Sequence, residues 1–362
     1  MADWFERLVG FSEDEQSYEE TQARFIVEHE ASTGSTVLTS KANGRRMVAG
    51  RFESVSLAQL RKRVDDIVTS RRRTSTCSDT GTSPFAANTV REYVGDIRTI
   101  LNDPSNAGSM IQVASQFNCL EMIEPRVTPE MGIAIYENDK TQGPICAMAC
   151  GAGTIYRNYL VEITKGGVGG VVGQTADRQL DGLHRLGLEL GNANGNLWTM
   201  QNGYCQATSS GLATINDILA AASEENMDHF RGLLEVGVQW DTEVTSATST
   251  TVNPLCLSQI FCSALPVSYA RRSIEKSEWK NFATLVLEAA YEATILAAIV
   301  NREHTGCNKL YLTALGGGAF GNTEKWIFDS MQRALETYSN FGLDICIVSY
   351  SRSNSHARRL EC

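Results

Sequence analysis

The hydrophobic and polar positions near the C-terminal end of the chain predict a strand, a glycine turn, a helix and a second strand. Residues 310–315 form an apolar run of strand length, and residues 343–350 form another. Between residues 326 and 338, apolar side chains recur with the period of an amphipathic helix, which Asn322 or Thr323 can cap. This order predicts a βαβ unit with two parallel strands and a right-handed crossover.

The turn between the first strand and the helix reads Leu-Gly-Gly-Gly-Ala-Phe-Gly-Asn over residues 315–322. Without Cβ atoms, glycines let a ligand approach the backbone amides, and the positive end of the following helix favours an anion. The spacing is neither that of a P-loop nor the Gly-x-Gly-x-x-Gly of a dinucleotide fold. A tight turn without a ligand is the alternative. Three consecutive glycines cost more chain entropy than one turn requires, so we predict a phosphate or diphosphate site.

Periodicity and turn signals predict further elements along the chain. They are a hairpin over residues 36–52 with its turn at Asn43-Gly44, helices over 56–68, 90–101 and 277–305, a helix of small residues over 143–153, a hairpin over 197–208 and a strand over 233–245. Residues 110–118 and 255–265 are further apolar runs. The mixture of strands and helices predicts an α/β protein.

Two polar stretches interrupt this pattern. Residues 69–88 combine three arginines with a tract rich in Ser, Thr, Gly and Pro, which predicts a mobile loop or, alternatively, a basic clamp on an acidic ligand. Residues 166–175 are dense in glycine and predict either a lid over a pocket or a plain linker. We therefore predict an N-terminal extension over residues 1–88, with hairpin, helix and loop, and a second domain over residues 89–362.

Composition narrows the class of function. The formal net charge of −10 argues against a general nucleic-acid or membrane-surface binder, and Glu292 interrupts the longest apolar run. Ten cysteines without a Cys-x-x-Cys pair indicate reduced thiols, so we expect a cytoplasmic or otherwise intracellular protein. Five scattered histidines without a close cysteine cluster give no zinc signature. We expect neither a metal nor a cofactor, and the oligomeric state stays open.

The glycine turn and its flanking elements resemble the C-terminal part of a macrodomain, closest to the microbial poly(ADP-ribose) glycohydrolase-like branch. The resemblance rests on Ala-Leu-Gly-Gly-Gly-Ala-Phe-Gly-Asn, the helix after it and Ile-Cys-Ile-Val-Ser-Tyr, within residues 279–350. It implies a macrodomain-like three-layer α/β/α core with the N-terminal β-hairpin-plus-helix extension and insertions. It also implies that the turn wraps the diphosphate of ADP-ribose. The ligand-binding residues implied in this way are Gly316, Gly317, Gly318, Ala319, Phe320, Gly321 and Asn322, with Phe320 packing on the ligand.

The same resemblance assigns the ribose contact and questions the catalytic group. An apolar run that ends in Phe-Asn implies that Asn118 contacts the ribose, although an Asn that ends a strand in a turn is equally ordinary. The family's Gln-Glu-Glu motif, which carries its catalytic acid, is absent between Asn118 and Gly143. Glycosidic hydrolysis needs a carboxylic acid beside the leaving oxygen. The candidates are Glu121, Glu124 and Asp139, with Gln142 as a residue that can hold the water.

Three functions stay open on this evidence. The first is hydrolysis of ADP-ribosyl linkages on ADP-ribosylated protein, by an enzyme of the glycohydrolase type. The second is a non-catalytic module that binds ADP-ribose or a related nucleotide diphosphate. The third is a structural interaction protein that retains the fold alone.

Overall fold

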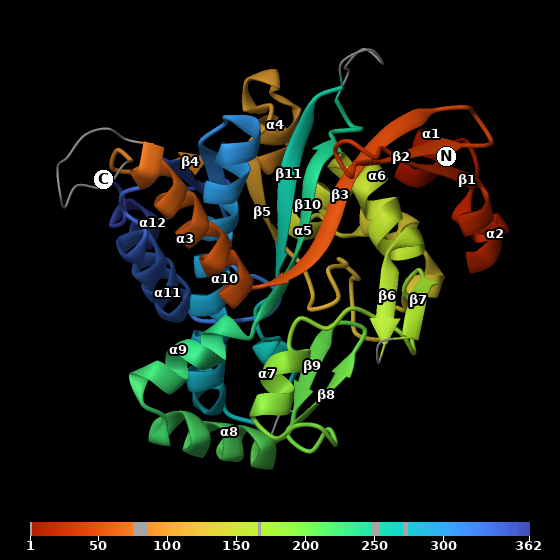
Figure 1. The fold of residues 1–362 in the computed structure, drawn as a ribbon. Coiled ribbons are helices and arrows are strands. Elements are labelled where there is room, and N and C mark those ends of the chain that lie inside the picture. Colours follow the sequence, from red (N-terminus) through yellow and green to blue (C-terminus); the bar gives the residue numbers. More distant parts are fainter. Residues whose placement is uncertain (1, 75–84, 166–167, 248–253, 271–273) are drawn as a thin grey trace.

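A nine-stranded mixed sheet lies between two layers of helices in the computed structural model, which describes residues 2–74, 85–165, 168–247, 254–270 and 274–362 (Figure 1). In spatial order the strands are β1 (Phe25–His29), β2 (Thr36–Ser40), β3 (Arg46–Ser56), β10 (Glu235–Glu243), β11 (Cys256–Cys262), β5 (Met110–Ala114), β12 (Lys309–Leu312), β13 (Asp344–Ser349) and β4 (Thr89–Val94). The predicted α/β class and three-layer arrangement are confirmed.

The remaining elements surround this sheet. They are the helices α1 (Trp4–Val9), α2 (Tyr18–Ala23), α3 (Leu57–Thr74), α4 (Ile97–Asn102), α5 (Gln142–Ala149), α6 (Gly151–Ile155), α7 (His184–Glu189), α8 (Ser209–Ala221), α9 (Glu224–Gly232), α10 (Lys280–Thr305), α11 (Glu324–Thr337) and α12 (Ser355–Arg358). The short helices are η1 (Glu13–Glu15), η2 (Pro104–Asn106), η3 (Pro129–Met131), η4 (Ala134–Asn138), η5 (Tyr156–Leu160), η6 (Val267–Tyr269) and η7 (Lys276–Trp279). Two small hairpins pair β6 (Glu162–Lys165) with β7 (Val168–Val172) and β8 (Trp198–Gln201) with β9 (Tyr204–Ala207).

Five neighbouring strands, β11, β5, β12, β13 and β4, run parallel to one another. Their carboxyl ends therefore share one edge of the sheet, where ligands bind in open α/β sheets. β12 pairs with β5 only at Leu310 and Tyr311, so the two strands separate toward that edge. The predicted strand–turn–helix–strand unit is confirmed as β12, α11 and β13, with parallel pairing between its two strands.

Side chains alternate between the two helical layers, as the pleat of a strand requires. Leu310 and Leu312 belong to the hydrophobic cluster formed with α3, α10 and α11. Tyr311, which lies between them in β12, belongs to the cluster formed with α4 and α5. Both faces of the central strands are thus buried, which explains why β12 and β13 are continuous apolar runs and not alternating ones.

The long helix α10 confirms the predicted 277–305 helix and ends at Gly306, whose φ of 78° is the left-handed conformation of a glycine cap. In the part of the chain that the structure describes, it is the one helix long and apolar enough to cross a membrane. The helix passes this test with Glu292 inside it, so the expectation that Glu292 keeps every apolar run shorter than a membrane span was wrong. However, 83% of its most apolar window is buried inside the protein, as in a core helix.

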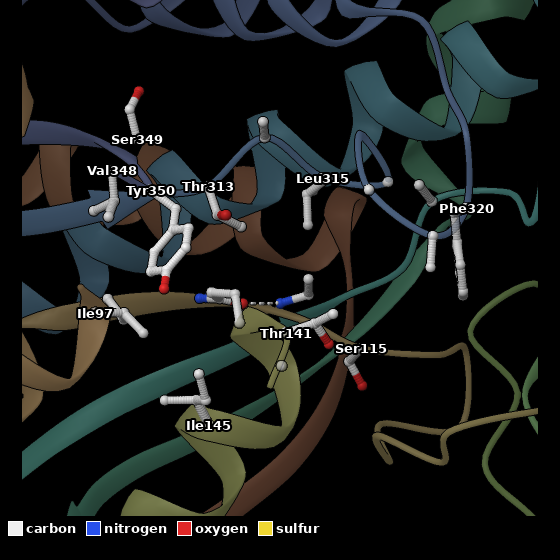
Figure 2. A pocket seen from close by; sticks show the side chains of 18 of the residues that line it. Ile97, Ser115, Thr141, Ile145, Thr313, Leu315, Phe320, Val348, Ser349 and Tyr350 are labelled. Atoms are coloured by element: carbon white, nitrogen blue, oxygen red, sulfur yellow. Dashed lines mark hydrogen bonds between the residues drawn. The ribbon is translucent and has the colours of Figure 1, made fainter. Parts of the chain in front are cut away.

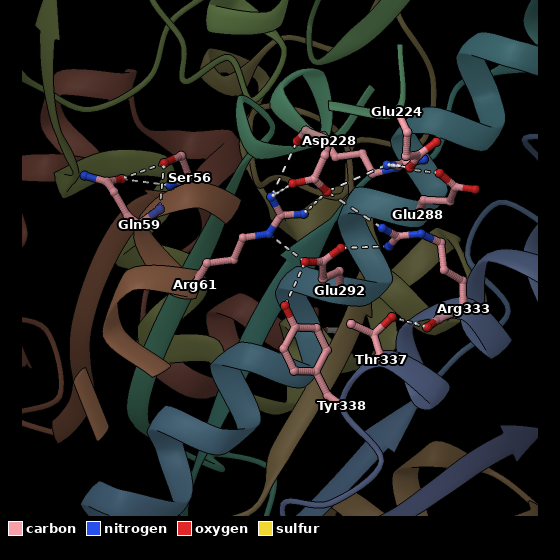
Figure 3. A network of polar contacts seen from close by, with 11 residues as sticks. Ser56, Gln59, Arg61, Glu224, Asp228, Glu288, Glu292, Arg333, Thr337 and Tyr338 are labelled. Carbon is pink, nitrogen blue, oxygen red and sulfur yellow. Dashed lines mark hydrogen bonds and ion pairs between the residues drawn. The ribbon is translucent and has the colours of Figure 1, made fainter. Parts of the chain in front are cut away.

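Glu292 lies in the middle of α10 and joins three helices (Figure 3). Its side chain is 2% exposed and accepts hydrogen bonds from Arg61 Nε at 2.7 Å and Arg333 Nη1 at 2.8 Å. Tyr338 donates a third bond at 2.9 Å. Burial opposes ionisation of Glu292, but the bonds from the two arginines outweigh it and hold the pKa below 4.5. The ionised carboxylate therefore links α10 to α3 and α11.

We expect Glu292→Gln to destabilise the protein by about 3 kcal/mol at pH 7, because two partly buried guanidinium groups lose the negative carboxylate that they share. Chemical denaturation measures this difference. Since the pKa of Glu292 is lowered, its contribution is present above pH 4.5 and is lost as the pH falls through the lower value. Asp329→Asn, which breaks an exposed pair with Lys325 on α11, should cost less than about 0.5 kcal/mol. Equal stabilities for the two variants would contradict this assignment.

Three predictions of local structure need correction. The helix over residues 90–101 is wrong, because β4 is followed by a break at Gly95 and a new helix, α4, that Asp96 caps. Apolar residues at 90, 94, 97 and 101 match a helical period by coincidence. Residues 168–172 form strand β7 and not a loop, whereas residues 166–167 lie outside the described residues. Helix α3 continues to Thr74, and residues 75–84 of the predicted mobile loop are also outside that part of the chain.

The residues before the predicted boundary near residue 88 share a sheet and a helical layer with the residues after it. β3 and β10 pair over six residues, from Glu235↔Ser56 to Trp240↔Arg51. The N-terminal hairpin, confirmed as β2 and β3, thereby continues the central sheet. α3 packs against α10 in the same layer. The N-terminal residues are thus integrated into the core of the protein.

Candidate functional site

A cavity of about 810 Å³ opens at the carboxyl edge of the parallel strands. Its walls come from the ends of β5, β12, β13 and β4, from the glycine turn, from the start of α5 and from residues 349–358. Figure 2 shows Ile97, Val348 and Tyr350 grouped on one side and Phe320 on the other, with Thr141 and Ser115 between them.

The glycines of the turn differ in what they do. Gly316 and Gly321 have positive φ values of 69° and 71°. A Cβ at Gly316 would lie 2.5 Å from Ala264 Cβ, and one at Gly321 would lie 1.8 Å from Ser268 Oγ. These two glycines are therefore required by the path of the backbone.

Gly318 has no such structural requirement. It lines the cavity, its φ is outside the left-handed region, and a Cβ there would meet no heavy atom of the described residues within 4 Å. The missing side chain keeps the cavity open and leaves the backbone accessible.

The other predicted turn residues divide between those that line the cavity and those that do not. Ala319 and Phe320 line the cavity with Gly316 and Gly318. Gly317 faces helix α11, where a Cβ would lie 3.2 Å from Ile327 Cδ1. The Asn322 amide donates to Leu265 O at 2.8 Å and holds the turn against the segment after β11, while Thr323 caps α11. Gly317, Gly321 and Asn322 thus shape the turn from outside the cavity wall.

Asn118 is fully buried and lies outside the cavity wall. Its Nδ2 donates to Gln179 Oε1 at 2.8 Å, and its Oδ1 accepts from Leu120 N at 3.1 Å. Both ends of the amide are used to hold the turn after β5. The predicted contact between Asn118 and the ribose stays a prediction, and the position of Asn118 outside the cavity wall does not favour it. The alternative, an Asn that ends a strand in a turn, accounts for both hydrogen bonds of the side chain.

Gln142 begins α5 and borders the cavity. Its Oε1 accepts from Ala114 N at 2.8 Å, and its Nε2 donates to Gln112 O at 2.7 Å. The amide thus replaces the backbone partners that β5 loses where β12 separates from it. Gly143 permits this contact, since a Cβ there would lie 2.0 Å from Ala114 O. Gln142 is occupied by the fold, which weakens its predicted role in holding water.

Glu121 is the candidate acid that the structure places in the cavity wall with its charge buried. The residue is 1% exposed, and neither carboxyl oxygen has a hydrogen-bond partner among the described residues. Arg157 Nη2 lies 3.6 Å from Oε2, and the Tyr136 hydroxyl accepts from the Glu121 amide at 3.0 Å. Burial raises the pKa of Glu121 to about 7, although Arg157 and Ser115 oppose the shift.

The two other predicted carboxylates are placed differently. Asp139 borders the cavity but is half-buried, and its Oδ1 accepts from Thr141 N at 2.8 Å at the start of α5. Glu124 is outside the cavity wall and pairs with Arg126 at 2.6 Å. Of the three, Glu121 alone combines a fully buried position in the cavity wall with two carboxyl oxygens that accept no hydrogen bond from the described residues.

Two groups at the opposite end of the cavity were missed in the sequence. Asp96 lies directly after β4, caps α4 and pairs with Arg98 at 2.8 Å, which holds its pKa below the usual value. Tyr350 follows β13 and is 73% exposed, with its ring turned toward Ile97 (Figure 2). The Gly95-Asp96 pair after an apolar run was the available signal, but the false helical period concealed it.

Cations border the same cavity. Lys140, Arg352 and Arg358 contribute to its wall, and within the described ranges none of the three forms a salt bridge. The rim also carries Asp139 and Glu324. The wall also contains Asp96 and Glu121, so the cations do not outnumber the carboxylates, but these three cations are available to an anionic ligand.

Comparisons with known proteins give structural neighbours only. The sequence matches no protein-family model and no curated protein. Poly(ADP-ribose) glycohydrolase from Deinococcus radiodurans in complex with ADP-ribose is 9% identical with a TM-score of 0.38, covering 85% of this chain and 90% of that one. The glycohydrolase from Thermomonospora curvata is 12% identical with a TM-score of 0.37 and covers 95% of both chains. These neighbours belong to the branch that the glycine turn resembles. At TM-scores below 0.5, individual residues are not equated between the chains.

Proposed function

We propose that this protein binds ADP-ribose or a related nucleotide diphosphate and hydrolyses an ADP-ribosyl bond, with Glu121 as the general acid. The observation that carries the proposal is a buried carboxyl with two free oxygens in the wall of a cavity whose glycine turn is open to an anion. A carboxyl with a pKa of about 7 is partly protonated near neutral pH and can donate that proton.

Each part of the ligand has a chemically matching wall. Tyr350 and Ile97 offer flat and apolar surface for a purine, and the Asp96 carboxylate can accept from an exocyclic amine. The diphosphate fits the backbone of the glycine turn with Lys140, Arg352 and Arg358 around it. The reacting ribose is then directed toward Phe320, Ser115 and the Glu121 carboxyl.

Hydrolysis requires one proton transfer in each direction. Glu121 donates its proton to the leaving oxygen as the bond between that oxygen and the anomeric carbon breaks. Water then adds to the anomeric carbon, and its proton returns to the Glu121 carboxylate. The products are free ADP-ribose and the released hydroxyl or acid group, so atoms and charges balance without a cofactor.

A binding module without catalysis is the second candidate, and the occupied Gln142 amide supports it. With no second free acid assigned, such a protein would retain ADP-ribose without cleaving its linkage to protein. The two candidates predict the same affinity and differ in turnover.

Calorimetric titration with ADP-ribose, followed by incubation with mono- and poly-ADP-ribosylated protein, tests the proposal. Binding with release of ADP-ribose supports the hydrolase. Binding without release selects the binding module, and absence of binding refutes both. AMP and ribose 5-phosphate serve as controls, because each lacks one half of the ligand and should bind more weakly.

A further inference from the structure

Arg157 is an arginine buried completely behind the wall of the cavity, on the short helix η5. Its Nε donates to Cys119 O at 2.9 Å, and its Nη2 donates to Thr154 Oγ1 at 3.2 Å. The guanidinium carbon lies 3.7 Å from the centroid of the Phe261 ring. Nη1 has no hydrogen-bond partner among the described residues. Two hydrogen bonds and the Phe261 ring therefore fix the guanidinium in place. Its positive charge has no hydrogen-bonded carboxylate among the described residues.

The charge nearest to this guanidinium is that of Glu121, at 3.6 Å between Nη2 and Oε2. Arginine stays protonated under all ordinary conditions, so the pair always contains one positive charge. We propose that Arg157 is a positioning residue, which fixes the Glu121 carboxyl in the cavity wall through its charge without a hydrogen bond to either carboxyl oxygen. The inference rests on the proposed role of Glu121 as the acid.

Another pair in the same protein shows why the distance matters. Arg63 binds Glu53 through two bonds of 2.7 and 2.8 Å, and Trp240 adds a third to the same carboxylate. Although burial opposes it, these bonds keep the pKa of Glu53 below its usual value. Such a carboxylate cannot donate a proton near pH 7. Arg157 is offset from Glu121, which is the arrangement that steadies an acid without ionising it completely.

No other charged group competes for this role in the described surroundings of Glu121. The titratable groups that face it are Cys119, Tyr136 and Cys146, from the turn after β5, η4 and α5. Burial raises the pKa of Cys119 to about 12 and those of Tyr136 and Cys146 well above their ordinary values. All three are neutral near pH 7. Arg157 is thus the group whose charge Glu121 senses.

The test is a titration of Glu121 that does not depend on activity. With carboxyl-labelled glutamate, comparison with Glu121→Gln identifies the Glu121 signal by NMR. We expect Arg157→Met to raise its midpoint above the wild-type value of about 7, by about one unit or more, because the nearby positive charge is removed. Arg63→Met removes an arginine from a remote pair and should leave the midpoint unchanged. An unchanged midpoint in Arg157→Met overturns the inference.

A second measurement uses the wild-type side chain, in case Arg157→Met does not fold. The ¹⁵Nε signal of Arg157 should shift with the Glu121 midpoint, and this shift should disappear in Glu121→Gln. A signal that does not respond to pH near 7 contradicts the coupling. In the activity assay, the rate of Arg157→Met should fall at a higher pH than the wild-type rate, because the midpoint of Glu121 is higher. Coupling without turnover refutes the hydrolase alone, whereas turnover without coupling refutes the role of Arg157 alone.

Discussion

We expect Glu121→Gln to lower the proposed rate of ADP-ribosyl hydrolysis by about 10² to 10⁴ and to leave the affinity for ADP-ribose within a few-fold of wild type. This is the range that general acid catalysis supplies. Gln has almost the same shape as Glu but has no proton to give to the leaving oxygen. Binding persists in this expectation because the diphosphate contacts the glycine turn and the cations at the rim, and not the acid.

The pH dependence gives this prediction a second measurement. Glu121 must be protonated to act, so the wild-type rate should be highest below pH 7 and fall as the pH rises through the pKa of about 7. The residual rate of Glu121→Gln should lack this limb, because the titrating group is gone. Single-turnover rates between pH 5 and 9 on ADP-ribosylated protein measure both effects.

Glu124→Gln is the matched control for this substitution. Glu124 is three positions further along the chain, lies outside the cavity wall and pairs with exposed Arg126. The same chemical change there should alter the rate by less than about two-fold, since exposed ion pairs contribute little. Asp139→Asn tests the remaining carboxylate of the cavity. If Asp139→Asn loses the rate and Glu121→Gln does not, the acid has been assigned to the wrong residue.

The fold was predictable wherever local pattern and tertiary burial agree. A few consecutive residues are enough to predict β12 and β13 from their apolar runs and α10 from its helical period. At residues 90–101 the local pattern was misleading, because strand residues and helix residues on two sides of Gly95 happened to share one period. Gly95 and Asp96 mark this break in the sequence. Their importance is recognised only in the structure, where Asp96 caps α4.

The acid could be reduced to three candidates from the sequence and no further. What distinguishes Glu121 is burial, and burial depends on residues far along the chain. Arg157, 36 positions later on η5, and the Tyr136 hydroxyl on η4 lie next to Glu121 only in the folded protein. The spacing of these residues along the sequence does not predict that they are in contact. The resemblance of the glycine turn predicted the location of the cavity but not which of its glycines faces it.

Gly318→Glu should weaken ADP-ribose binding by about 100-fold while the melting temperature stays near that of wild type. The fold accepts a side chain here, since a Cβ would meet no heavy atom of the described residues within 4 Å and the backbone does not need a positive φ. The new carboxylate then points into the cavity where the diphosphate is proposed. Two unit charges about 4 Å apart repel by about 4 kcal/mol at an effective dielectric constant of about 20, and salt reduces this value.

Two further substitutions at the same position separate charge from size. Gly318→Ala should change the affinity by no more than about three-fold, and Gly318→Gln should fall between Ala and Glu because it adds bulk without charge. Isothermal titration with ADP-ribose at low and high salt measures the series, and the gap between Gln and Glu should narrow at high salt. Gly317 is less informative, because a side chain there meets Ile327 and tests packing. If Gly318→Glu folds and binds ADP-ribose as wild type does, the diphosphate does not lie at this turn.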